Sequence, residues 1–328
     1  MTGDSSNRLT LTPEQTAFFK ENGYLVLRDV LDRNLCAQAR DRMWASLPEG
    51  SHLKRDDPDT HYAPFPDHET SDDPLYIRRN ERWHLREAST EQFLIDLIYC
   101  PDLCNVAEQL LGEGLLQPPV PDGEPMGSRG PAWPGGPTDP AIGDGVRGFY
   151  WTLPDRSKTA NVDPAHTDGH PFNLGVIGVL NDVPEDGGAF TVWPGSHRRL
   201  YPTFQLQYDQ PRIPYYDHMP SLKGIINPPE YDAELKAIKE DTQAVVCHGK
   251  EGDVVLWHHR LAHMAGNNNS DVIRQVVLND FNRKDLDTCR LDPPQENMWH
   301  DWSGEVNDTA VSYSVEFARD QGITSKVD

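Results

Sequence analysis

Two potential metal ligands lie close together in the segment PAHTDGHPF, residues 164 to 172. His166 offers an imidazole nitrogen and Asp168 a carboxylate oxygen, and a turn at the end of a strand can aim both side chains to one side. Such triplets also occur as ordinary polar turns, so the segment alone does not define a site. A metal site requires a third ligand from another part of the chain.

A second segment, EGDVVLWHHRLAHMAGNNNSDVIRQVVLNDF at residues 251 to 281, contains the candidates for that third ligand. They are His258, His259 and His263. Residue type and spacing leave the choice among the three open.

The same segment places an arginine on an apolar strand face. In VIRQVVL, alternation puts Arg274 on one face together with Val276 and Leu278. A buried guanidinium without an anionic partner is very costly. A structural ion pair with an acidic residue satisfies this requirement, and so does a carboxylate ligand that the planar guanidinium binds through two hydrogen bonds.

The elements that position these residues belong to a chain of 328 residues, of which 37% are hydrophobic. A chain of that length buries a sizeable core. Nowhere do about 18 apolar residues follow one another, so the sequence contains no candidate membrane span. The N-terminal segment MTGDSSNRLTLTPEQ lacks the basic and apolar regions of a secretory signal, and we predict a cytoplasmic protein.

The formal net charge of −22 argues against nucleic acid or an anionic membrane as a partner, because both repel an acidic surface. A small molecule is the expected ligand. The five cysteines are scattered, which predicts reduced thiols rather than a disulfide framework. Cys100 and Cys104 form the one close pair, and we expect them to pack in the core.

Signals for a helix are clear near the start of the chain. Thr12 is a natural N-cap, Pro13 suits the first helical position, Gln15 completes a capping box, and Gly23 is placed to end the helix. The segment YLVLRDV is predicted to follow as a strand.

The rest of the segment 1–116 is predicted to be mainly helical, with helices over roughly 32–47 and 90–111. Residues 117–145 contain so much proline and glycine that regular structure is excluded. A loop of this length is either a functional lid or a linker.

From Val146 onward short apolar runs alternate with turn residues, as in VRGFYWTLP, FNLGVIGVL, GAFTVWP, TQAVVCH and DVVLWHH. Many short strands separated in this way are typical of a sandwich or jelly roll. We therefore predict a mainly β protein with N-terminal helices, organised as one domain over 1–328. Its jelly-roll core spans 146–284, with an insertion at 201–241 that includes one short helix, and 285–328 form a C-terminal extension.

Four segments together resemble the phytanoyl-CoA dioxygenase family of iron(II)- and 2-oxoglutarate-dependent oxygenases. They are LTPEQTAFFKENGYLVL, the HTD triplet, GGAFTVWPGSHR and HMAGNNNSDVIR. They occur in the family's order from residue 11 to residue 274, so the resemblance covers most of the chain. It implies a double-stranded β-helix, a cupin-like jelly roll, in agreement with the pattern of strands.

The resemblance also implies which residues bind the iron. His263 opens a segment of the form H-x-x-G-x-N-x-S-D, as the family's distal histidine does. The implied Fe(II) ligands are therefore His166, Asp168 and His263. The other histidines of these segments are not expected to be ligands: His170 and His197, for which surface or supporting roles are predicted, and His258 and His259.

Arg274 stands where such sequences have the arginine that binds 2-oxoglutarate. Thr167 and Thr191 are predicted to contact the same cosubstrate. Family members often carry a hydroxyl residue two positions after the distal histidine, and this chain has Ala265 there. Thr191 is the predicted substitute for that hydroxyl.

The implied reaction uses Fe(II), 2-oxoglutarate and O₂. 2-Oxoglutarate yields succinate and CO₂ while a C–H bond of a small organic metabolite is oxidised. Relatives that halogenate lack the carboxylate of Asp168, so its presence predicts hydroxylation, with desaturation, epoxidation and ring formation as alternatives. Two other classes compete, namely a zinc hydrolase with the same ligand types and a non-catalytic jelly-roll binding protein.

Substrate contacts are predicted in the two irregular segments, 117–145 and 201–241, because specificity in such a fold comes from segments around a fixed centre. The predicted contacts are Trp133, Tyr215 and Tyr216. In the alternative interpretation both segments lie on the surface and contact no ligand.

Overall fold

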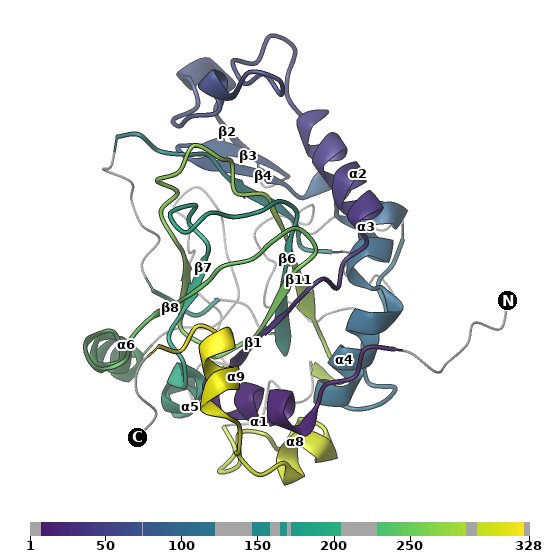
Figure 1. Cartoon of the computed structure of the whole chain (residues 1–328), viewed down its shortest axis with the longest axis vertical. Helices are drawn as coiled ribbons and strands as arrows, with labels where there is room; N and C mark the ends of the chain where they lie inside the picture. Colours follow the sequence, from purple (N-terminus) through teal and green to yellow (C-terminus); the bar gives the residue numbers. More distant parts are fainter. Residues whose placement is uncertain are drawn as a thin grey trace, which may run out of the picture.

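The computed structural model describes residues 8–73, 75–121, 146–157, 165–168, 172–204, 228–286 and 294–324. In this part of the chain two antiparallel β-sheets face each other, and helices cover the larger sheet from outside (Figure 1). The arrangement is a jelly roll, as the pattern of short strands predicts. None of the helices within these ranges is long and apolar enough to cross a membrane.

The larger sheet, as far as the structure describes it, has eight strands in the order β1-β9-β6-β11-β5-β4-β3-β2. Its strands are β1 (Tyr24–Leu27), β2 (Ser71–Asp73), β3 (Tyr76–Arg79), β4 (Arg82–Leu85), β5 (Gly148–Thr152), β6 (Leu174–Val179), β9 (Val254–His258) and β11 (Val276–Phe281). Each neighbouring pair is antiparallel. The N-terminal strand β1 thereby joins the sheet beside the strands that form its centre.

The smaller sheet of the described chain has the order β10-β7-β8. Its strands are β7 (Phe190–Val192), β8 (Val245–Cys247) and β10 (His263–Ala265). In the pairing of β10 with β7, His263 lies opposite Val192 and Ala265 opposite Phe190. Because paired residues share a face and neighbours alternate, Thr191 and Met264 occupy the other face of this sheet.

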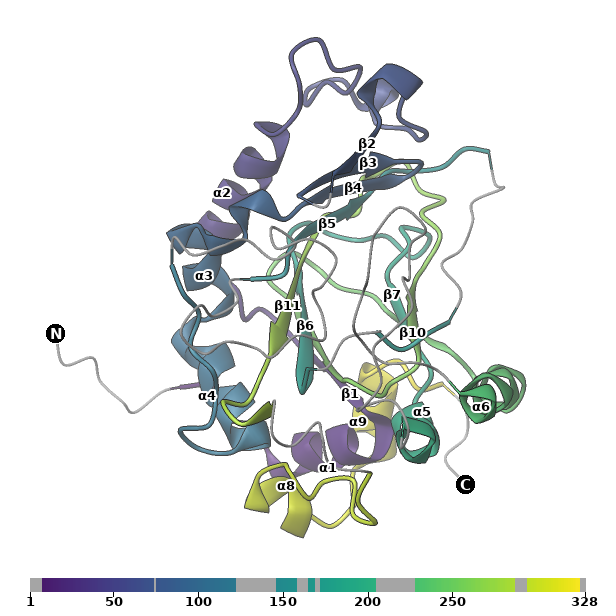
Figure 2. The same ribbon diagram turned by 180° about the vertical axis from the view of Figure 1, so that it is seen from behind.

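Helices gather in three places around the sheets, and both views show the same grouping (Figures 1 and 2). Along the larger sheet lie α2 (Arg33–Trp44), α3 (Gln92–Ile98) and α4 (Pro101–Leu111). At one end of the molecule lie α1 (Pro13–Asn22), α8 (Gly304–Asp308) and α9 (Val315–Asp320). Beside the smaller sheet lie α5 (Ser196–Leu200) and α6 (Pro229–Asp241), and α6 is the helix predicted within the insertion 201–241.

The boundaries predicted for the first helix are confirmed in detail. The Thr12 side chain accepts a hydrogen bond from the Gln15 N–H, and the Gln15 side chain accepts one from the Thr12 N–H. Gly23 ends the helix with a left-handed φ of 78°, a conformation that favours glycine. The chain then enters β1 directly, so these caps set the direction in which the first strand approaches the sheet.

The prediction of a mainly helical segment 1–116 is wrong in one region. Three strands, β2 to β4, extend the edge of the larger sheet. Their short, charged sequences resemble solvated turns, and such residues are tolerated at a sheet edge. The helix predicted over 90–111 is two helices, because Pro101 begins α4 and cannot continue α3. Cys100 and Cys104 pack against the core, as predicted.

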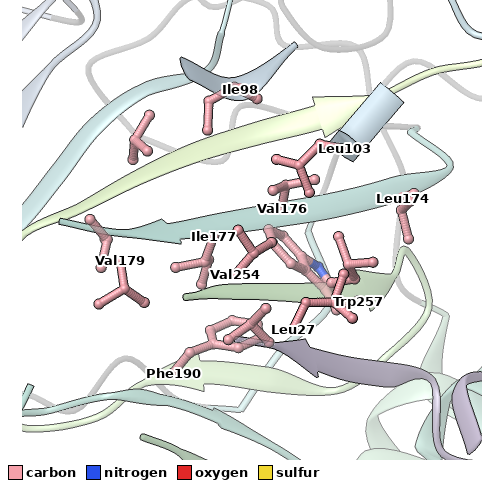
Figure 3. Packing of buried hydrophobic residues seen from close by; sticks show 14 of the residues in the cluster. Leu27, Ile98, Leu103, Leu174, Val176, Ile177, Val179, Phe190, Val254 and Trp257 are labelled. Carbon is pink, nitrogen blue, oxygen red and sulfur yellow. The ribbon is translucent and has the colours of Figure 1, made fainter. Parts of the chain in front are cut away.

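The central strand β6 is buried on both faces (Figure 3). Ile98 of α3 lies on one side of it, and Phe190 of β7 lies on the other. Ile177 pairs with Leu278 of β11, and both belong to the side that meets the smaller sheet. We call this side of the larger sheet the inner face.

Trp257 of β9 connects the hydrophobic core with His263, one of the predicted metal ligands. It lies on the inner face opposite Gly175, and a Cβ at Gly175 would be 2.1 Å from the indole ring. Only glycine at position 175 lets the ring lie flat on β6, and the ring then packs 5.8 Å from the His263 imidazole, centroid to centroid. The next residue, His258, points to the opposite face, where it stacks on Trp302 at 5.0 Å.

Candidate metal centre

Backbone hydrogen bonds hold the two predicted histidine ligands side by side. The N–H of His166 donates to the carbonyl oxygen of His263 at 3.0 Å, and the N–H of His263 donates to that of His166 at 2.9 Å. This reciprocal pair fixes the two residues opposite each other, as in an antiparallel ladder. Their ring centroids are 4.7 Å apart.

Asp168 completes a converging set of three side chains. One ligand atom from each of His166, Asp168 and His263 lies within 4.8 Å of the others. No other histidine, cysteine or acidic residues of the described chain form such a group. Two imidazole nitrogens and one carboxylate oxygen are the donor set of non-haem iron sites with a facial triad, so the residues fit a bound iron ion.

His263 is held in the form that binds a metal. Its Nδ1 lies 2.9 Å from the carbonyl oxygen of Leu261, which makes Nδ1 the protonated nitrogen and leaves the lone pair on Nε2. Nε2 lies 3.8 Å from Asp168 Oδ2. Burial, and then the neighbouring His166, lower the pKa of His263 to about 4. The imidazole is therefore neutral near pH 7, as metal binding requires.

An arginine orients the carboxylate of Asp168. Arg147 Nη1 donates to Asp168 Oδ2 at 2.9 Å, and Nη2 donates to Oδ1 at 3.4 Å. The same guanidinium contacts Asp280 at 3.4 Å. Burial lowers the pKa of Arg147, but Asp168 and Asp280 outweigh burial and hold that pKa well above its ordinary value. A permanently charged guanidinium therefore fixes this ligand in place.

Helix α6 holds the residue between the two ligands of the HTD triplet. The backbone N–H and the hydroxyl of Thr167 both donate to the phenol oxygen of Tyr231, at 2.9 and 3.0 Å. Tyr231 lies in the first turn of α6 and is fully buried. Thr167 is predicted from the sequence to contact the cosubstrate, but its hydroxyl is directed to α6 instead.

Arg274 lies on the inner face, as the alternation along VIRQVVL predicts. Its backbone N–H and carbonyl oxygen pair with those of Thr152, both at 3.0 Å. Its guanidinium donates to Thr152 Oγ1 at 2.8 Å and to the carbonyl oxygen of Gly188. These contacts hold a buried guanidinium in one position on the side of the sheet that meets the metal ligands.

Thr191 is not the hydroxyl residue beside Arg274. It lies opposite Met264, on the face of the smaller sheet away from His263, and its hydroxyl donates to the carbonyl oxygen of Ala189 at 3.3 Å. The register therefore directs the Thr191 side chain away from the face that carries His263. Thr152 supplies the hydroxyl that contacts Arg274.

The remaining histidines have other environments. His258 and His259 do not belong to the converging group, and His259 packs against Phe172 with ring centroids 4.4 Å apart. His197, expected at the surface or in a supporting role, is fully buried against Trp299. Several predicted residues lie outside the described part of the chain: Trp133, His170, Tyr215 and Tyr216.

Three residues that support the site are missing from the sequence prediction: Arg147, Thr152 and Tyr231. Alternation along GFYWT was a usable signal for Thr152, since it places Thr152 on one face with Tyr150. Arg147 and Tyr231 carry no such signal. Their partners lie 21 and 64 positions away in the sequence, and only the fold brings them together.

Solved structures with a similar fold share little sequence with this chain. SnoK, a non-heme alpha ketoglutarate dependent carbocyclase from nogalamycin biosynthesis, is 19% identical with a TM-score of 0.48, over 88% of this chain and 95% of that chain. EctD from S. alaskensis is 16% identical with a TM-score of 0.46, over 85% and 79%. AviO1 from Streptomyces viridochromogenes Tue57 is 16% identical with a TM-score of 0.45, over 84% and 98%. No curated protein matches the chain by sequence.

A family model covers most of the chain. The model of the family described as Phytanoyl-CoA dioxygenase (PhyH) matches residues 19–276. The matched range contains the three converging side chains and Arg274. The chain therefore belongs to the phytanoyl-CoA dioxygenase family of iron(II)- and 2-oxoglutarate-dependent oxygenases.

Proposed function

We propose that this enzyme hydroxylates a C–H bond of a small organic molecule, with 2-oxoglutarate and O₂ as cosubstrates. We assign His166, Asp168 and His263 as the iron ligands. The observation that carries this assignment is the convergence of their three ligand atoms within 4.8 Å, on segments that a reciprocal backbone pair holds together.

When bound, iron supplies the oxidising chemistry that couples conversion of 2-oxoglutarate into succinate and CO₂ to oxidation of a substrate C–H bond. The chain contributes a rigid set of donors. Leu261 holds Nδ1 of His263 so that Nε2 faces the site, and Arg147 holds the carboxylate of Asp168. Because these partners fix the donors in advance, little ordering is left to occur on metal binding.

We assign Arg274 to the distal carboxylate of 2-oxoglutarate. Its guanidinium lies on the inner face and donates to two oxygen atoms, the Thr152 hydroxyl and the Gly188 carbonyl. A planar guanidinium held in this way binds a carboxylate through parallel hydrogen bonds. The mechanism of a zinc hydrolase does not account for a guanidinium at the position of Arg274.

The carboxylate of Asp168 supports hydroxylation rather than halogenation. It fills the position that is vacant in halogenating relatives, where a halide would bind. Arg147 makes its shorter carboxylate contact with Asp168, and without Asp168 it would keep only the contact with Asp280 at 3.4 Å.

The test measures succinate formed from 2-oxoglutarate by metal-stripped protein to which Fe(II) or Zn(II) is returned. Fe(II) is expected to restore turnover and Zn(II) is not. Asp168→Ala should lower turnover by about 100-fold or more, since changes even to residues behind a metal ligand cost about 10–100-fold.

Asp271→Ala is the matched control, because the Asp271 side chain is 83% exposed. It should retain wild-type turnover. Full turnover in Asp168→Ala, or turnover with Zn(II) in place of Fe(II), would contradict the proposed function.

A further inference from the structure

The inner face continues from the metal centre onto β4 and β5. Gly148 lies opposite Leu278, so alternation along β5 also places Tyr150 on the inner face. His84 of β4 lies opposite Tyr150, and their ring centroids are 4.3 Å apart. Two polar rings, tilted by 35° against each other, thus lie on the same side of the sheet as Arg274.

Arg86 lies across this surface because Gly148 has no side chain. A Cβ at Gly148 would lie 3.0 Å from the Cα and 3.3 Å from the Cγ of Arg86, and 2.7 Å from the carbonyl oxygen of Leu85. Gly148 also has a φ of 119°, which other residues rarely adopt. The close approach of the two strands at this glycine directs the stem of Arg86 over Tyr150.

The guanidinium of Arg86 is held through its Nε atom. Nε donates to the phenol oxygen of Tyr150 at 2.9 Å, and Cζ lies 5.4 Å from the centre of the Tyr150 ring. Among the residues that the structure describes, no carboxylate contacts Arg86. By contrast, the similarly half-buried Arg42 contacts both Glu87 and Glu91. Arg86 is therefore held through Nε, and none of the described acids forms an ion pair with its guanidinium.

Tyr150 connects Arg86 to the metal centre. Its phenol oxygen also lies 3.3 Å from Nε of Arg147, and Arg147 binds Asp168. Only two side chains therefore separate Arg86 from a metal ligand.

The charge at this surface is opposite to that of the whole chain. Burial, and then Arg82, Arg86, Arg274 and Arg147, hold the pKa of His84 well below its ordinary value. The net charge of the chain is −22. The four arginines that act on this half-buried ring create a local attraction for anions that the acidic surface as a whole lacks.

We propose that Arg86, positioned by Tyr150, binds an anionic oxygen group of the substrate, a carboxylate or a phosphate, beside the metal centre. A guanidinium binds either group through two parallel hydrogen bonds. Arg147 is engaged by Asp168, Arg82 lies 3.9 Å from Glu81, and Arg274 is assigned to the proposed cosubstrate. Arg86 is therefore the arginine that we assign to the substrate. That the bound anion belongs to a substrate rests on the proposed function.

Calorimetry on the iron-loaded protein tests this site, with saturating 2-oxoglutarate and without O₂, so that the cosubstrate site is filled and no turnover occurs. The probes are benzoate, phenyl phosphate and uncharged benzamide, which share a ring. One of the two anions is expected to bind at least about tenfold more tightly than benzamide, as charge-assisted hydrogen bonds imply. The preferred anion distinguishes a carboxylate site from a phosphate site.

Arg86→Gln is expected to abolish the preference for the anion, and Arg86→Lys to restore part of it. Tyr150→Phe keeps the ring, removes the oxygen that holds Arg86, and should weaken anion binding several-fold, which provides a second test if Arg86→Gln does not fold. Arg79→Gln is the matched control on the same hairpin, since Arg79 is 57% exposed and contacts Asp72. It should retain the preference.

Equal binding of anions and benzamide to the wild-type protein would overturn the proposal, and so would a preference that survives in Arg86→Gln. Failure of the proposed function has a different signature. In that case the wild-type protein would form no succinate with Fe(II), while an anion preference that depends on Arg86 would persist.

Discussion

At the scale of single residues, three functional side chains of the centre are each held in place by a neighbouring residue that is not itself a proposed metal ligand. Leu261 holds Nδ1 of His263, Arg147 holds the carboxylate of Asp168, and Thr152 holds the guanidinium of Arg274. Loss of such a partner typically costs a metal site about 10–100-fold in affinity or activity, because the partner removes alternative orientations of the ligand.

Arg274→Ala is expected to raise the concentration of 2-oxoglutarate needed for half-maximal turnover steeply. Loss of one partner of a buried charge pair costs on the order of 2–5 kcal/mol. Succinate formation measured against 2-oxoglutarate concentration gives this value. Arg156→Ala is the control, since Arg156 is 64% exposed. An unchanged requirement in Arg274→Ala would show that another residue binds the cosubstrate.

Substitutions at two threonines distinguish the hydroxyl residue assigned from the structure from the one predicted from the sequence. Thr152→Val removes a hydroxyl that contacts Arg274, and a hydrogen bond to a charged group contributes about 1.5–3 kcal/mol. We expect it to weaken 2-oxoglutarate binding about tenfold. Thr191→Val removes a hydroxyl that bonds only locally to Ala189 and should leave binding unchanged. The opposite ranking of the two variants would restore the role first predicted for Thr191.

At the scale of elements, the sequence predicts what depends on near neighbours. Thr12, Gln15 and Gly23 act within one or two helical turns, and α1 begins and ends where they indicate. The strands β2 to β4 and β10 are not predicted, because their short sequences become strands only by pairing with distant segments.

The same division holds for the site. The types and spacing of His166 and Asp168 indicate a possible metal site. The resemblance to a family then selects His263 as the third ligand among three candidate histidines. The residues that orient these ligands could not be predicted. Tyr231, for example, contacts Thr167 only because α6 packs beside the smaller sheet.

Tyr231→Phe tests whether α6 positions the metal ligands. The change removes the acceptor of two hydrogen bonds from Thr167 and leaves the buried N–H of Thr167 without this partner. Iron affinity, measured by competition with a chelator, should fall by about 10–100-fold, as for other residues behind metal ligands.

Tyr62→Phe is the matched control, because Tyr62 contacts two exposed residues, Asp271 through its phenol and Arg156 over its ring. It should keep wild-type affinity for iron. If Tyr231→Phe lowered the melting temperature and left iron affinity unchanged, α6 would serve stability alone.

At the scale of the whole molecule, several histidines are buried in the neutral state. Burial lowers the pKa of His84, His197 and His258, and that of His197 reaches about 3. His197 lies between α1 and the aromatic cluster of Trp299, and its Nε2 is 3.2 Å from the carbonyl oxygen of Lys20. A proton on this ring would have to be buried in an apolar environment.

We therefore expect the stability of the folded protein to fall in acid, and we expect His197→Met to reduce this loss of stability. In the unfolded chain a histidine binds a proton below its ordinary pKa of 6.5, but folded His197 does so only near 3. Stability is thus lost as pH falls from 6.5 towards 3, at about 1.4 kcal/mol per pH unit for this residue. Denaturant unfolding between pH 7 and 4.5 should show a slope shallower by this amount in His197→Met, whatever its stability at pH 7. The exposed His300→Met should keep the wild-type slope, and equal slopes in all three proteins would mean that protonation of His197 does not oppose folding.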